Sequence, residues 1–185
     1  MIKHLVAGLL LAASFLSACA APPPPEDGEV SRLADALQQM GPGIDPDEAR
    51  RAAALAFAHS TDLATSYGVT TSAILHNTLV NSGVKQRGLC KHYAEDMQRR
   101  LSQEGFTTLT VLRAIAEPRN SFRIEHSSAV IAPVGGDIYN GIIIDPWRDA
   151  GDLYWSPTRA DPRYDWEPRM TVLRRKHERR LASEG

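Results

Sequence analysis

The amino-acid sequence predicts an α+β domain in which N-terminal helices and one cysteine-bearing helix pack on an antiparallel β-sheet. Up to about residue 104, apolar residues recur every three or four positions, and the segments they form end at glycines. After Gly105 the pattern changes to runs rich in β-branched residues. Short turns separate these runs, which favours antiparallel pairing of successive strands.

The chain has 185 residues and a formal net charge of −1, with six histidines and two cysteines. This length suits one domain with a hydrophobic core, which we place at residues 29–185. The charge gives no reason to expect a nucleic-acid partner. The histidines and cysteines are too few and scattered for a cysteine-framed zinc module or a disulfide scaffold. We find no internal repeat and no glycine loop for phosphate.

The N-terminus predicts export and a lipid anchor. Residues 1–18 have a short basic start and an apolar run that is too short to span a membrane, as in a signal peptide. The run closes on Leu-Ser-Ala-Cys, which matches the bacterial lipobox and makes Cys19 the lipidated residue. An ordinary secretory signal is the alternative. Residues 19–28, with four prolines, are the expected tether. We therefore expect a membrane-anchored domain in the bacterial cell envelope, facing the periplasm.

Three helices are predicted before the second cysteine. The first covers about residues 30–40, and the second runs to about residue 60 after Asp45, a suitable N-cap, with Glu48 completing a capping box. The third runs from a cap at residue 71 or 72 to residue 81. Its apolar spacing places His76 in solvent and predicts an inward face made of Ile74, Leu75, Thr78 and Leu79.

The next predicted helix, about residues 89–104, carries Cys90 in its first turn. The unpaired amides and dipole of a helix N-terminus stabilise an anion, which favours a thiolate and can hold an oxyanion. If Cys19 is lipidated, Cys90 has no intramolecular disulfide partner. An unpaired cysteine in an exported protein suggests a reactive thiol or an intermolecular bridge, and a buried core cysteine is the bland alternative. The thiol shares its helix face with Tyr93, Ala94, Met97 and Leu101.

Three strands are predicted at 106–115, 124–131 and 139–145, followed by a short edge strand at 151–155. The period of two puts His126 on a partly apolar face, and Asp145 ends the third strand before a proline. A proline- and aromatic-rich cover follows at 161–168. The stretch from residue 173 to 181 is predicted to be a basic, solvated helical tail with at most weak attraction to an anionic membrane.

A thiol at a helix start, followed by a histidine and an aspartate on successive strands, meets the geometric needs of a cysteine nucleophile with an oriented base. The motifs Gly88-Leu89-Cys90, Glu125-His126-Ser127-Ser128-Ala129-Val130 and Ile144-Asp145-Pro146-Trp147 resemble the transglutaminase-like branch of the papain-like superfamily. The resemblance covers about residues 75–155.

The resemblance implies a papain-like core and acyl transfer on amides, with no metal or other cofactor. Cys90 would attack a carbonyl, His126 would serve as base and then acid, and Asp145 would orient the imidazole. The Cys90 amide would help to hold the oxyanion. The substrate would be a protein or peptide of the cell envelope. Hydrolysis and transamidation are both open, as is the oligomeric state.

Some residues depart from the family pattern. Lys91 stands where many relatives have an aromatic residue, and Gln86, the candidate for a second oxyanion donor, is closer to the cysteine than in papain-like proteases. The aromatic and basic residues after Asp145 either wall a cleft or pack the sheet edge; these are Trp147, Arg148, Tyr154 and Trp155.

Two other functions are compatible with the sequence. The first is a non-catalytic lipoprotein that keeps the fold as a binding or scaffold module. The second is a metal site that uses Cys90, His126 or Asp145. His92 is a weaker ligand because it points away from Cys90 on the helix, where we expect it to pair with Asp96 one turn later.

Overall fold

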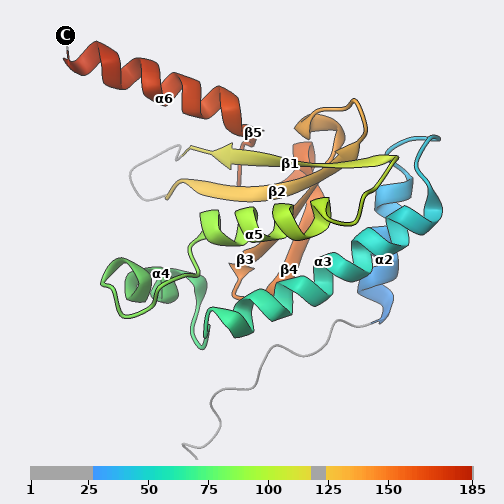
Figure 1. The fold of residues 1–185 in the computed structure, drawn as a ribbon, viewed down its shortest axis with the longest axis horizontal. Helices are drawn as coiled ribbons and strands as arrows, with labels where there is room; N and C mark the ends of the chain where they lie inside the picture. The colour runs from blue at the N-terminus through green and yellow to red at the C-terminus, as the bar shows by residue number, and fades with distance from the viewer. Residues whose placement is uncertain (1–26, 118–123, 185) are drawn as a thin grey trace, which may run out of the picture.

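A computed structural model describes residues 27–117 and 124–184 (Figure 1). The predicted signal peptide, Cys19 and the tether up to residue 26 lie outside the described residues. The described chain contains five α-helices and one five-stranded antiparallel sheet, which confirms the predicted α+β class. Within these residues, no helix has the length and apolar character needed to cross a membrane.

Four helices precede the sheet: α2 (Asp27–Gln38), α3 (Pro46–Ser66), α4 (Ala73–Asn81) and α5 (Cys90–Ser102). α3 packs between α2 and α5 (Figure 1). α2 includes the last two residues of the expected tether, and α3 runs six residues beyond its predicted end. Asp45 caps α3 as predicted, because its Oδ1 accepts from the amides of Asp47 and Glu48 at 2.7 and 3.0 Å.

Glu48 does not complete the predicted capping box. Its buried carboxylate instead accepts four hydrogen bonds, at 2.6–2.9 Å, from the amides and hydroxyls of Thr107 and Thr108 just before the first strand. Burial raises the pKa of Glu48, but these bonds outweigh burial and lower it to about 2. The side chain therefore ties the start of α3 to the edge of the sheet.

The sheet has the order β4-β3-β2-β1-β5, and all neighbouring strands are antiparallel. As predicted, the long strands follow one another through short connections. The bounds are β1 (Leu109–Ala116), β2 (His126–Pro133), β3 (Ile142–Asp149), β4 (Asp152–Pro157) and β5 (Glu167–Pro168).

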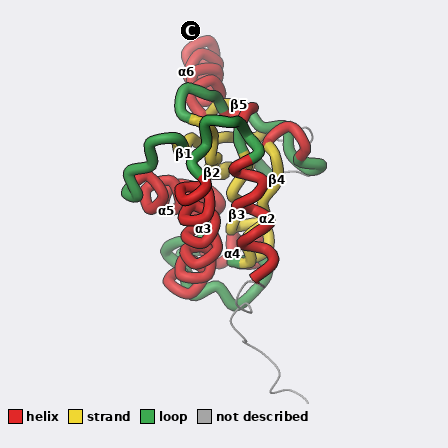
Figure 2. Tube along the Cα trace, turned by 90° about the vertical axis from the view of Figure 1, so that its right-hand side faces the viewer, coloured by secondary structure: helices red, strands yellow, loops and turns green. Residues whose placement is uncertain are grey.

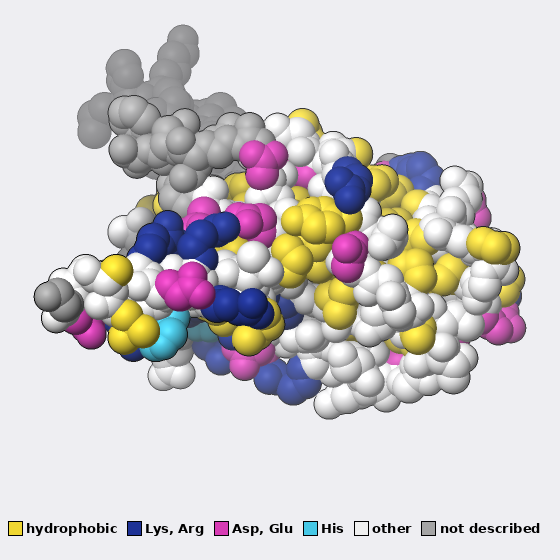
Figure 3. All heavy atoms as spheres, turned by 90° about the horizontal axis from the view of Figure 1, so that it is seen from above, with side chains coloured by type: hydrophobic (Ala, Val, Ile, Leu, Met, Phe, Trp, Pro, Cys, Tyr) yellow, Lys and Arg dark blue, Asp and Glu magenta, His cyan; other side chains and the backbone are white. Residues whose placement is uncertain are grey.

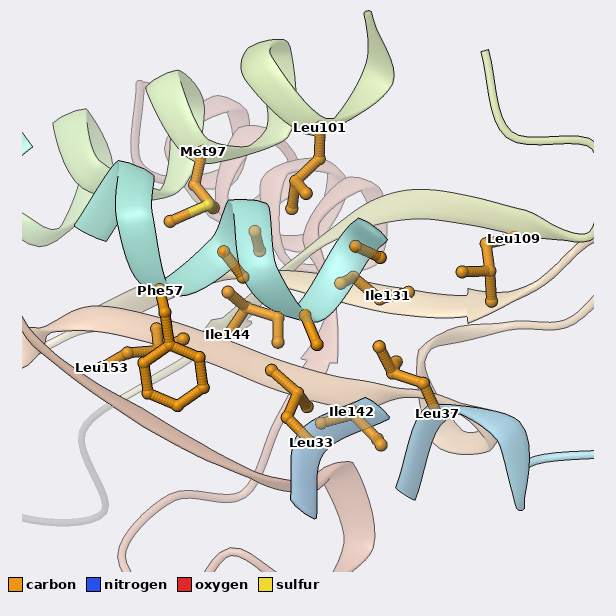
Figure 4. Packing of buried hydrophobic residues seen from close by; sticks show 14 of the residues in the cluster. Leu33, Leu37, Phe57, Met97, Leu101, Leu109, Ile131, Ile142, Ile144 and Leu153 are labelled. Carbon is orange, nitrogen blue, oxygen red and sulfur yellow. The ribbon is translucent and has the colours of Figure 1, made fainter. Parts of the chain in front are cut away.

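The main core lies between the helices and one face of the sheet (Figure 4). α5 packs across β1, β2 and β3. Its predicted apolar face is confirmed, since Tyr93, Ala94, Met97 and Leu101 are all buried. Along β2, Ala129 and Ile131 point into this core, whereas Val130 points to a smaller cluster on the other face with Trp166. The cysteine helix is thus held rigidly against the central strands.

The inward face predicted for α4 is wrong. Ile74 and Leu75 are 59% and 51% exposed, whereas Ala73 and His76 are buried. α4 is a short helix that contacts the body through polar groups rather than an apolar stripe. Its Asn77 Oδ1 accepts from Trp147 Nε1 at 3.0 Å, and His76 Nε2 lies 2.9 Å from the Arg87 carbonyl. These tertiary contacts, not the local apolar spacing, decide which side of α4 faces inward.

The basic C-terminal segment is a helix, α6 (Arg169–Glu184), longer than predicted. It projects from the body in both views (Figures 1 and 2). Its basic side chains are not simply solvated: they form ion pairs with carboxylates on the segments beside it. These pairs are Arg175 with Glu117 and Glu167, Lys176 with Glu125, and Arg179 with Glu117.

Candidate active site

The loop before α5 is shaped by a glycine that no other residue could replace without strain. Gly88 has φ +121°, and a Cβ there would lie 2.2 Å from His76 Nε2. His76 is buried, and its Nε2–H donates to the Arg87 carbonyl. The close approach of His76 to Gly88 therefore sets the direction in which the chain enters α5.

A buried polar network holds the same loop to the body of the helix. The Asp96 carboxylate pairs with Arg87 at 2.8 Å and also accepts from the Tyr67 hydroxyl and from Arg99. Asp96 therefore does not pair with His92, contrary to our expectation. Burial raises the pKa of Asp96, but these partners outweigh burial and keep the pKa below its ordinary value. The network fixes the residues just before the thiol.

His92 performs a different task. Its Nδ1 accepts from the amides of Gly88 and Leu89 at 3.2 and 3.3 Å. Burial, and then the nearby charges of Arg87 and Lys91, lower the pKa of His92, so its ring stays neutral and can accept. Among the described residues, the amides of Cys90 and Lys91 have no acceptor. These two N–H groups are the ones free to bind an oxyanion at this helix end.

His126 and Asp145 form a fully buried pair. His126 Nε2 lies 2.6 Å from Asp145 Oδ2, and the side chains are 0% and 1% exposed. Asp145 lies inside β3 and not at a strand end as predicted. Its strand continues through Pro146 because the pairing with β4 shifts register between Asp145 and Asp149. The register shift thus accommodates the proline within the strand and keeps the Asp145 carboxylate within hydrogen-bonding distance of the imidazole.

Cys90 reaches this pair from the start of α5. Its Sγ lies 3.8 Å from the carbonyl oxygen of Glu125, the residue before His126. The thiol is partly exposed. Burial opposes charge on the His126 ring, but Asp145 and then Cys90 outweigh it and raise the pKa of His126 to about 9. The site therefore stabilises an imidazolium beside the thiol.

The two imidazole nitrogens have distinct partners. An ionised carboxylate only accepts, so His126 Nε2 carries the proton that Asp145 receives. Nδ1 is buried and has no hydrogen-bond partner within the described part of the chain. It is the nitrogen left for the thiol, and the nearby Cys90 contributes to the raised pKa of His126.

A buried arginine supports Asp145, and the sequence did not reveal this role. Arg148 Nε donates to Asp145 Oδ2 at 3.0 Å, and its two terminal nitrogens bind the Asp161 carboxylate at 2.6 and 3.3 Å. Burial raises the pKa of Asp145, but His126 and then Arg148 reverse this effect and lower it. Asp145 thus stays ionised in the interior. Arg148 lies three positions after Asp145 in the sequence, and this spacing was the available signal.

Aromatic rings cover the imidazole. Tyr164, Trp147 and Trp166 have ring centroids 4.6, 4.7 and 5.3 Å from that of His126. Tyr154 stacks on the Arg148 guanidinium at 3.7 Å. The sequence left open whether four residues after Asp145 wall a cleft or pack the sheet edge. Three of them, Trp147, Arg148 and Tyr154, surround the His126–Asp145 pair, whereas Trp155 packs against the main core.

Other candidate residues lie elsewhere. Gln86 is exposed in the loop and, among the described residues, has no hydrogen-bond partner. Lys91 is also exposed. No group of three or more histidine, cysteine, aspartate or glutamate side chains in the described ranges could hold a metal ion.

Comparison of the chain with protein-family models, with curated proteins and with solved structures finds no match. The transglutaminase-like resemblance therefore stays a prediction carried by the motifs themselves. The geometry does bring together the three residues that the sequence singled out. It presents a thiol at a helix start, a buried base and an ionised orienting group, which is the set of groups that thiol acyl transfer requires.

Proposed function

We propose that the domain is a cysteine acyltransferase or amidase of the transglutaminase-like kind, acting on a peptide or protein carboxamide. One observation carries the proposal: His126 is buried with Asp145 on Nε2 and the Cys90 thiol as the neighbour available to Nδ1. A histidine in a structural role would need no accessible thiol on its second nitrogen. In the proposed site, Nε2 is held by Asp145 and Nδ1 exchanges a proton with the thiol.

In the proposed reaction, the Cys90 proton resides on His126 Nδ1 as an imidazolium, and the thiolate Sγ attacks the carbonyl carbon of the amide. The developing oxyanion is held by the amides of Cys90 and Lys91. His126 then returns its proton to the leaving amine as the C–N bond breaks, which leaves a thioester on Cys90. Water, or a second amine, attacks the thioester with His126 again acting as base, and the free thiol is restored.

We also propose that the protein works in the bacterial envelope, anchored through Cys19 with the domain facing the periplasm. The support is the signal-like residues 1–18 and the lipobox. Cys19→Ser should move the protein from the membrane fraction to the soluble fraction, whereas a protein that stays with the membrane after this substitution would contradict lipid anchoring.

Thiol labelling tests the catalytic proposal. Iodoacetamide should modify Cys90 rapidly at neutral pH, and His126→Ala should slow this modification about tenfold or more, because the base no longer favours the thiolate. The modified site is identified by mass spectrometry, since the chain has a second cysteine. A hydrolysis assay on peptide amides should show a loss of about 10²–10⁴-fold in His126→Ala and complete loss in Cys90→Ala.

His177→Ala is the matched control, because His177 lies exposed on α6. It should leave both labelling and hydrolysis unchanged. Asp145→Asn, which keeps the shape of the side chain, provides a second variant if His126→Ala does not fold. Slow labelling that responds to neither His126 nor Asp145 would refute the proposed chemistry and favour the non-catalytic binding module.

A further inference from the structure

A pocket of about 500 Å³ opens at the edge of the sheet, where β5 ends and α6 begins. β5 pairs only with Ala114 and Ile115, so β1 has no strand neighbour on this side from Leu109 to Arg113. The pocket lies beside this open edge, on which Gln98 Nε2 already donates to the Val111 carbonyl at 3.0 Å. The view from above shows apolar side chains gathered over the middle of this face (Figure 3). The pocket is lined by Gln98, Leu112, Arg113, Gly136, Asp137, Ile138, Pro168, Arg169 and Met170.

The pocket contains two guanidinium groups without a salt bridge to any described carboxylate. Arg113 is half-buried, and its Nε is a buried donor with no partner in the described ranges. Burial, and then the charge of Arg169, lower the pKa of Arg113, which indicates that the two arginines repel each other. The Asp137 carboxylate also lines the pocket, where it accepts from the Tyr139 amide at 2.8 Å, and it offsets one of the two positive charges.

This lack of a salt bridge contrasts with the other arginines near the site. Arg148 has two carboxylates, and Arg175 also has two. The pocket lining therefore has two guanidinium groups against one carboxylate, that of Asp137, next to apolar walls. Its volume is in the range of pockets that bind ligands. An anionic group joined to an apolar chain would match both features.

Arg113 also connects the pocket to the candidate active site. Its guanidinium lies 3.2 Å from Ser127 Oγ and 3.5 Å from the Lys91 carbonyl oxygen. Ser127 follows the base in sequence, and Lys91 follows the nucleophile. A ligand bound at Arg113 would therefore lie close to the segments that carry the thiol and the imidazole.

We propose that this pocket binds an acidic peptide segment, with its carboxylates on Arg113 and Arg169 and its backbone along the open edge of β1. Apolar side chains of the peptide would pack on Leu112, Ile138 and Met170. The mode is strand addition, in which main-chain hydrogen bonds supply affinity and side-chain pockets supply specificity. This inference rests on the proposed function, because it makes the pocket the subsite for the substrate segment beside the amide that Cys90 attacks.

Direct binding tests the inference without turnover. The full chain with Cys90→Ala is titrated with a fluorescent peptide of alternating valine and glutamate, and with the same peptide carrying glutamine in place of glutamate. The acidic peptide should bind at least about tenfold more tightly, and the difference should shrink at high salt. Arg169→Gln and Arg113→Gln should each reduce its affinity about tenfold, measured in the same titration.

Arg174→Gln is the control, since it removes an exposed arginine from α6 outside the pocket. It should leave binding unchanged. Equal affinity for the two peptides, or equal losses in Arg174→Gln and Arg169→Gln, would overturn the inference. Binding of inorganic phosphate, followed by isothermal titration calorimetry, together with no binding of the acidic peptide would overturn it in favour of a small-anion site.

The two proposals fail differently. Peptide binding that depends on Arg169, in a protein whose Cys90 labelling ignores His126, would support the pocket and refute the chemistry. Labelling that depends on His126, with no preference for the acidic peptide, would support the chemistry and refute the pocket.

Discussion

Asp145→Asn is expected to reverse the protonation preference of His126. In the native fold, burial opposes charge on the ring, but Asp145 and Cys90 raise the pKa of His126 from 6.5 to about 9. This difference corresponds to about 3 kcal/mol in favour of the imidazolium. Asparagine keeps the shape and the burial but removes the negative charge. The pKa of His126 should then fall below 6.5, because burial remains and its main compensation is lost.

The pH dependence of stability gives the sign of this effect. In the native protein, the raised pKa means that His126 contributes stability in full below pH 6.5 and loses this contribution as the pH rises through about 9. In Asp145→Asn, the lowered pKa makes protonation favour the unfolded chain. The stability of the variant should therefore increase with pH up to about 6.5 and then level off.

Urea unfolding from about pH 5 to about pH 10 measures the free energy of unfolding, and an NMR titration of the His126 ring measures its pKa. Loss of the Asp145–Arg148 ion pair lowers the free energy of unfolding by an amount that does not change with pH, since neither group titrates in this range. Asp152→Asn is the control, because it removes an exposed carboxylate from the adjacent strand. An imidazole titration unchanged by Asp145→Asn, or stability profiles that run parallel, would refute the reasoning.

Three further substitutions test what holds the site, all by urea unfolding. Arg148→Met should cost about 3–5 kcal/mol, because it removes a buried guanidinium that pairs with the carboxylates of both Asp145 and Asp161. A change below about 1 kcal/mol would contradict this. Gly88→Ala should cost about 2–4 kcal/mol, since it combines a strained φ with a clash against His76; native stability would show that the loop adapts. Glu48→Gln should cost about 1–3 kcal/mol near neutral pH. The lowered pKa of Glu48 makes its contribution full above pH 4.5 and lost as the pH falls towards about 2, so the gap between the two proteins should close in acid.

Much of the fold could be predicted because its signals are local. The face of α5 that packs on the sheet follows from apolar spacing, and the N-cap of α3 follows from Asp45 before a proline. The strands follow from β-branched runs and short turns. Each of these patterns involves residues within a few positions of one another, where backbone sterics and periodicity decide the outcome.

The errors arose where distant residues compete with a local pattern. Glu48 was expected to bond its own helix end, but two threonines from residues 107–108 offer four donors. His76 was expected in solvent, but the Arg87 carbonyl and the space left by Gly88 draw it into the interior. Asp145 was expected to end a strand, but the register shift with β4 lets the strand continue.

The sequence by itself determined the fold class, the helix that begins at Cys90 and the choice of His126 and Asp145 as its companions. Only the tertiary structure decided that the imidazole points Nε2 at Asp145 and leaves Nδ1 for the thiol. It also decided that His126, together with Arg148 held by Asp161, keeps the carboxylate ionised. The reason is physical: the charge state of a buried group depends on every dipole and charge within a few ångströms, and here those groups come from segments far apart in the chain.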